Sequence, residues 1–97
     1  MMYLITWKAN MSLFPTDQEE RTKLTMSWTE KMKKDLDSGK VKMWGISIGG
    51  GKGFSVVEGS GKEIFADSMF YTPYLKSKVK PMLSFDEWMD AMKGMQP

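Results

Sequence analysis

The chain has 97 residues, which is enough for one domain, residues 1–97, with a modest hydrophobic core. Its 41% hydrophobic and 27% charged residues are typical of a globular protein, and a net charge of +2 does not point to nucleic acid or an anionic membrane as partner. The absence of cysteine and histidine excludes disulfides, thiolate and imidazole metal ligands, and the common hydrolytic triads.

No targeting or membrane segment is predicted. No apolar run approaches the roughly 20 residues of a transmembrane helix. The N-terminal segment has no positive leader before its apolar run and no small-residue cleavage site, so we expect no signal peptide and a cytoplasmic protein without a membrane partner.

The first part of the chain predicts a strand and a long helix. The β-branched and aromatic residues of Met2–Lys8 are typical of a strand. Thr16 and Glu19 have the spacing of a capping box, in which each side chain satisfies a free backbone donor of the other. We therefore expect a helix from Thr16 to about Ser38, with Gly39 as its left-handed stop.

The long helix carries apolar residues at every fourth position. They are Leu24, Trp28, Met32 and Leu36. This spacing places all four on one helical face and predicts a buried stripe.

Two further strands and a turn follow. Val41–Ile48 and Phe54–Glu58 predict strands, and Gly49–Gly51 predicts a hairpin turn that needs positive φ. A phosphate-binding loop is excluded, because Gly51 stands where the lysine of that motif belongs and a strand, not a helix, follows.

The last part predicts a helix, a strand and a final helix. Capping boxes at Ser60–Glu63 and Ser84–Glu87 begin the two helices, and Pro73 ends the first of them. Leu75–Leu83 predicts the strand between. The order β-α-β-β-α-β plus a C-terminal helix predicts an α+β, ferredoxin-like fold with a four-stranded antiparallel sheet.

The segment Lys52–Gly59, KGFSVVEG, resembles the third-strand octapeptide of RNA-recognition motifs. In that family, rings on the first and third strands stack on bases, and here Tyr3 and Phe54 would supply them. The segment departs from the pattern at Val56, where a stacking ring is usual. An RNA-recognition-like binding module therefore stays as an alternative, and nucleic acid is not the expected partner.

A second resemblance covers nearly the whole chain. It rests on five segments: Gly45, the turn Gly49–Gly51, Gly53–Ser60, Tyr71–Tyr74 and Val79–Glu87. Of these, Gly53–Ser60 predicts a strand that ends in Glu before a capped helix. These segments resemble the dimeric α/β-barrel superfamily, and within it small proteins similar to muconolactone isomerase and the antibiotic-biosynthesis monooxygenases. The resemblance implies a dimeric barrel without a cofactor, and covers isomerases, monooxygenases and ligand-sensing domains. The histidines that some members use are absent, so no catalytic set carries over.

Both faces of the predicted sheet are apolar, which also indicates a homodimer. Strand one places Tyr3, Ile5 and Trp7 on one face and Met2 and Leu4 on the other; strand two places Trp44, Ile46 and Ile48 on one face and Val41 and Met43 on the other. Two helices cover only one face of such a sheet. A second copy stacking its sheet would cover the other, with the C-terminal helix packing across the interface.

Two charged groups are candidate functional residues. Glu58 ends an apolar strand, on the side of Phe54 and Val56, and partial burial would make it a general base, or else it caps the strand–helix junction. Lys76, Lys78 and Lys80 alternate along one strand and point to one face. Lys78 could hold an anionic ligand, or the three could form a solvated face that discourages aggregation.

Aromatic residues supply the candidate pocket. Its walls would come from Trp7, Trp44, Tyr71 and Tyr74. Methionines at spacing three in the last helix indicate packing rather than copper ligation, so no metal site is predicted. We expect a small-molecule-binding protein for an aromatic or anionic ligand. The alternative is a cofactor-free isomerase or monooxygenase acting on an aromatic or lactone-like compound with Glu58 as base, and whether the protein is an enzyme stays open.

Overall fold

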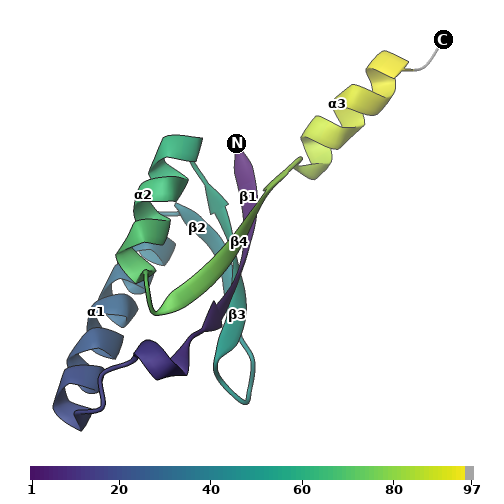
Figure 1. Ribbon diagram of the computed structural model, residues 1–97. Helices are drawn as coiled ribbons and strands as arrows, with labels where there is room; N and C mark the ends of the chain where they lie inside the picture. The colour runs from purple at the N-terminus through teal and green to yellow at the C-terminus, as the bar shows by residue number, and fades with distance from the viewer. Residues whose placement is uncertain (96–97) are drawn as a thin grey trace.

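A computed structural model of the chain describes residues 1–95 and contains one four-stranded antiparallel sheet. The strands, in the spatial order β2-β3-β1-β4, are β1 (Met2–Ala9), β2 (Val41–Ile46), β3 (Lys52–Glu58) and β4 (Leu75–Met82). The helices are α1 (Gln18–Asp37), α2 (Gly61–Tyr71) and α3 (Phe85–Met95), with a short 3-10 turn η1 (Met11–Leu13) before α1. Since α1 and α2 lie on the same side of the sheet (Figure 1), the predicted ferredoxin-like fold is confirmed.

Side-chain caps begin the helices, as predicted for two of the three. The Ser60 hydroxyl accepts from the Glu63 backbone N–H at 3.2 Å, and Ser84 and Glu87 bond each other reciprocally at 3.0 and 3.1 Å. The prediction of Thr16 as the cap of α1 is wrong. Asp17 has the extended backbone of a capping residue and accepts from the Glu20 N–H, so α1 begins one residue later than the capping-box pattern indicates.

Glycines end α1 and form the hairpin between β2 and β3. Gly39 follows α1 with a φ of 80°, and Gly50 and Gly51 have φ values of 76° and 81°. Only glycine takes this left-handed conformation without a steric penalty, so the predicted helix stop and turn are both confirmed.

The register divides the strand residues between two faces. The face under α1 and α2 carries Tyr3, Ile5, Trp7, Val41, Trp44, Ile46, Ser55, Val57, Ser77 and Val79. The opposite face, here called the open face, carries Met2, Leu4, Thr6, Lys8, Met43, Lys52, Phe54, Val56, Glu58, Lys76, Lys78, Lys80 and Met82.

One residue of β2 lies on the face opposite to its prediction. Val41 pairs with Val57, on the helix-covered face, whereas Met43 pairs with Val56, on the open face. An irregularity between Val41 and Met43 adds a residue to β2 and shifts the alternation of side chains, which a strict two-residue period cannot anticipate.

The buried core is small. Val41, Val57 and Ile64 are its fully buried apolar residues within residues 1–95, and Tyr3, Ile5 and Met32 pack against them. The predicted burial of the α1 stripe is wrong, because no residue of α1 is fully buried and Leu36 is 41% exposed. The stripe faces a cavity instead of close-packed side chains, as described below.

The helix α3 extends from the end of β4 and projects away from the sheet and the other helices (Figure 1). The molecule is therefore elongated, with extents of 63 × 26 × 24 Å. Its radius of gyration is 16.1 Å, whereas a compact chain of 100 residues has about 13 Å. Among residues 1–95, no helix has the length and apolar content needed to cross a membrane.

Candidate ligand-binding cavity

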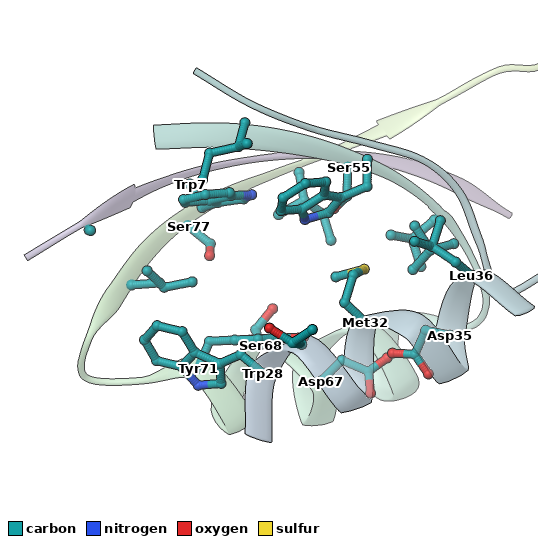
Figure 2. Close-up of a pocket in the computed structure, with 18 of the residues that line it drawn as sticks. Trp7, Trp28, Met32, Asp35, Leu36, Ser55, Asp67, Ser68, Tyr71 and Ser77 are labelled. Carbon is teal, nitrogen blue, oxygen red and sulfur yellow. The ribbon is translucent and has the colours of Figure 1, made fainter. Parts of the chain in front are cut away.

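A cavity of about 650 Å³ lies between the helix-covered face of the sheet and the two helices (Figure 2). Strand side chains form one wall, and side chains of α1 and α2 form the other. The lining is mainly apolar, from Ile5, Trp7, Ala9, Phe14, Trp28, Met32, Leu36, Trp44, Ile46, Val57, Ile64, Tyr71 and Leu75 among others. This volume and composition are typical of sites for small organic molecules.

Aromatic rings stand on both walls of the cavity. Trp7 from β1 and Trp44 from β2 lie side by side on the sheet, with ring centroids 6.3 Å apart and an interplanar angle of 26°. On the helix wall, Trp28 and Tyr71 have centroids 5.9 Å apart. A ligand between the walls would therefore meet aromatic side chains of both the sheet and the helices.

Tyr74 supports the helix wall from behind. The centroid of its ring lies 5.6 Å from that of Phe14 and 5.9 Å from that of Trp28. Phe14 and Trp28 both line the cavity, whereas Tyr74 does not. These edge-on and tilted contacts restrain the orientation of the Trp28 indole. Tyr74 thus packs against two lining residues without lining the cavity itself.

A few hydroxyl groups interrupt the apolar lining. Ser55 on β3, Ser68 on α2 and Ser77 on β4 all line the cavity, and Figure 2 shows the Ser77 hydroxyl turned toward the space. Ser55 is buried between the strands, with 5% of its surface exposed. A hydroxyl can donate and accept, so these groups suit a ligand with a carbonyl, ether or hydroxyl substituent.

Four charged residues at the rim of the cavity form a chain of ion pairs. Lys31 Nζ lies 3.0 Å from Asp35 Oδ2 and 3.1 Å from Asp67 Oδ1, and Lys40 Nζ lies 2.6 Å from Asp67 Oδ2. Burial opposes ionisation of both Lys31 and Asp67, but the hydrogen bonds and opposite charges outweigh it. The pKa of Lys31 is therefore raised and the pKa of Asp67 is lowered. Both groups stay charged and neutralise each other.

The Tyr71 hydroxyl is a buried polar group without a hydrogen-bond partner in the described part of the chain. Burial, reinforced by the nearby carboxylates of Asp35 and Asp67 and only partly opposed by Lys31, raises the pKa of this phenol. Tyr71 is therefore neutral at physiological pH. Its ring forms cavity wall, while its oxygen is closed off from solvent.

The structure brings together some of the predicted site residues and separates others. Trp7, Trp44 and Tyr71 line one cavity. Glu58 and Lys78 are exposed and belong to the open face, on the other side of the sheet from that cavity. The structure thus places no predicted base or anion-binding lysine beside the aromatic walls.

Sequence reasoning missed the contribution of α1 to the cavity. The spacing of Trp28, Met32 and Leu36 predicts a buried face of α1, whereas the structure places all three in the cavity lining. The sequence feature that could have indicated a cavity is the size of the side chains on the two facing surfaces. Two indoles on the sheet opposite a third on the helix hold the layers apart, which a uniform aliphatic face would not do.

The two rings compared with RNA-recognition motifs lie on different faces of the sheet. Tyr3 pairs with Val57 and packs against the core under α2, whereas Phe54 pairs with Thr6 on the open face. Since base stacking needs both rings on one surface, the pair does not form a stacking platform.

Acidic side chains do not gather into a metal site in the described part of the chain. Within residues 1–95 there is no group of three or more potential ligands placed to hold an ion. Of the carboxylates in the cavity lining, those of Asp35 and Asp67 form ion pairs with lysines.

A family model described as "Domain of unknown function (DUF3303)" matches residues 1–96. The chain belongs to this family. No curated protein matches the chain. The match spans every element that lines the cavity, so the cavity lies within the DUF3303 domain itself.

Proposed function

We propose that this DUF3303 protein binds a small, neutral aromatic molecule in the cavity between its sheet and helices. The supporting observation is the pair of facing aromatic walls, with Trp7 and Trp44 on the sheet and Trp28 and Tyr71 on the helices. Flat apolar rings gain both area burial and offset stacking in such a site.

The charge of the lining favours a neutral ligand over an anion. The lysines at this rim, Lys31 and Lys40, already bind Asp35 and Asp67. A carboxylate entering the cavity would lose its hydration and would meet three carboxylates of the lining, Asp35, Asp37 and Asp67, against one lysine, Lys33, that has no ion pair within residues 1–95. The lysine predicted for an anionic ligand, Lys78, belongs to the open face. A phenol, aryl ketone or aromatic lactone therefore fits better than an aromatic acid.

We also propose a homodimer of the dimeric α/β-barrel type, as the resemblance to muconolactone isomerase-like proteins implies. The open face carries Leu4, Phe54, Val56 and Met43 beside its lysines, and Met43 is 57% exposed. Leu4, Phe54 and Val56 are half-buried, and apolar side chains left partly exposed together on one sheet face support an interface there. A second copy would cover this face and supply the core that one copy lacks.

The proposal contains no catalytic step. The carboxylate predicted as a base, Glu58, is exposed on the open face and is remote from the aromatic walls. Against the opposing effect of burial, hydrogen bonds to Lys40 and Lys31 lower the pKa of Asp67, so this carboxylate is a poor proton acceptor, and Asp35 is paired with Lys31. Binding or sensing is the activity that this lining supports.

A ligand panel tests the proposal. Isothermal titration calorimetry would compare neutral phenols, aryl ketones and aromatic lactones with matched benzoates. We expect the neutral compounds to bind and the carboxylates to bind at least about tenfold more weakly. Trp44→Ala should lower affinity about tenfold, because it removes one ring of the sheet wall.

The matched control is Phe65→Ala on α2. Phe65 is 68% exposed and outside the cavity lining, so ligand affinity should not change. If no neutral aromatic compound gives binding heat, or if benzoates bind best, the proposed ligand class is wrong.

A further inference from the structure

We propose that α3 of each copy packs on the lysine-bearing end of its partner's open face, so that the two copies exchange their C-terminal helices. This rests on the proposed homodimer and specifies which part of the second copy covers which part of the sheet.

The lysines gather at one end of the open face. Lys8 of β1 stands directly opposite Lys52 of β3 and Lys76 of β4, which makes a row of three like charges across three strands. Lys78 and Lys80 continue along β4 on the same face. Like charges directly opposite each other destabilise a sheet unless an anionic group neutralises them. The acid of this face, Glu58, lies at the opposite end of β3.

The helix α3 carries the complementary surface. Its apolar residues Phe85, Trp88, Met89, Met92 and Met95 recur at helical spacing and are all exposed. Its first half adds three acidic residues, Asp86, Glu87 and Asp90, against one lysine, Lys93. Such a helix presents both an apolar stripe for Leu4, Phe54 and Val56 and negative charge for the lysines.

Its own sheet does not receive this helix. The reciprocal hydrogen bonds between Ser84 and Glu87 cap α3 at its start, and α3 leaves β4 in a direction away from the molecule (Figure 1). The nearest part of its own open face is the Glu58 end, since Met2 pairs with both Met82 and Glu58. Acidic residues at the start of α3 would face a like charge there.

A two-fold dimer would cover the exposed helix α3 and neutralise the lysine row in the same interface. Each copy then gives one acidic, apolar helix and receives one on its lysine row, in a self-complementary interface. Phe85 is 72% and Trp88 is 47% exposed in the single chain, and both would become covered. The exchange explains why the helix and the lysine row, which lie at opposite ends of the sheet, are both left without a partner in one copy.

A charge swap in the full chain tests the exchange. The helix variant is Asp86→Lys with Asp90→Lys, which leaves the capping residue Glu87 in place. The sheet variant is Lys76→Glu with Lys78→Glu. We expect each variant alone to dissociate at least about tenfold more readily than the wild type, by light scattering and sedimentation over a concentration series.

An equimolar mixture of the two variants should restore dimers, and native mass spectrometry should show them as heterodimers, because each altered helix then meets an altered sheet. Combining all four changes in one chain should restore the homodimer. The control for the sheet variant, Lys34→Glu with Lys62→Glu, changes the net charge by the same amount on the exposed surfaces of α1 and α2 and should leave dimerisation unchanged.

The outcomes separate the exchange from the proposals on which it rests. A monomeric wild type overturns both the homodimer and the exchange, while the ligand proposal is judged by its own titration. A dimer that both variants retain overturns the exchange alone. If the sheet variant instead abolishes binding of a single-stranded RNA probe while dimerisation is unchanged, the lysines serve nucleic acid and the exchange is wrong. Trp88→Ala with Met92→Ala, which cannot disturb the sheet, should also weaken the dimer at least about tenfold.

Discussion

Lys31 on α1 and Asp67 on α2 join the two helices through a 3.1 Å contact at the rim of the cavity. The second carboxylate oxygen of Asp67 binds Lys40, which directly precedes β2. Lys31 also lies 5.5 Å from the centre of the Phe70 ring. One carboxylate therefore connects α1, α2 and the residue before β2, at the rim of the cavity.

Replacing this carboxylate tests its contribution. Asp67→Asn should lower the free energy of unfolding by about 1–3 kcal/mol, because partly buried Lys40 loses its charged partner and Lys31 keeps only Asp35. Urea denaturation followed by circular dichroism measures the change. Glu19→Gln is the matched control, since its contact with Lys23 is 3.7 Å long and exposed, and should change stability by less than about 0.5 kcal/mol. Equal effects of the two substitutions would contradict the assigned role of Asp67.

The stability contributed by the Asp67 carboxylate should change with pH in a defined direction. The pKa of Asp67 is lowered in the folded protein, so its contribution is present above the unfolded pKa, near 3.8, and is lost as pH falls through the folded value. The pKa of Lys31 is raised above 10.5, so its contribution is complete below that value and is lost as pH rises through the folded pKa. The stability difference between wild type and Asp67→Asn should be constant near neutrality and shrink below about pH 4. A difference that persists at pH 2 would assign the effect to packing instead of charge.

Removing the isolated hydroxyl of Tyr71 should cost little. Tyr71→Phe deletes a buried group that has no hydrogen-bond partner among residues 1–95, so the free energy of unfolding should stay within about 0.5 kcal/mol or rise. Ligand affinity should also be retained, because the ring and not the oxygen forms the cavity wall. Tyr71→Ala is the contrasting variant and should lower both stability and affinity. A loss of affinity in Tyr71→Phe would show that the ligand itself satisfies the hydroxyl.

Structural features that depend on residues close together in the sequence are predicted well, whereas features that depend on distant residues are not. The Ser60–Glu63 and Ser84–Glu87 boxes are local, and the structure confirms both. The β2 irregularity at Val41 is set by pairing with β3, and the Lys31–Asp67 contact joins residues 36 positions apart. No local pattern contains either of them.

The candidate site shows the same division. Alternation along β4 correctly groups Lys76, Lys78 and Lys80 on one face, but it does not say which face the helices cover. That choice depends on where α1 and α2 pack, and it separates Lys78 from Trp7 and Trp44. Likewise, the period of the α1 stripe identifies its apolar face, whereas the volume left opposite that face follows from three-dimensional packing.

Gly53 should be among the least replaceable residues of the sheet. A methyl group there would overlap with the backbone oxygen of Gly45 on β2 and with the Trp7 indole on β1. Gly53→Ala should therefore separate β2 from β3 or displace Trp7, and lower the free energy of unfolding by about 1–3 kcal/mol. The displaced indole should also weaken ligand binding, since Trp7 is part of the cavity wall. Gly49→Ala is the matched control, because nothing lies within 4 Å of the added group. If chemical denaturation finds the two alanine variants equally stable, β2, β3 and Trp7 do not approach one another this closely in solution. The sheet wall of the cavity then has a different shape.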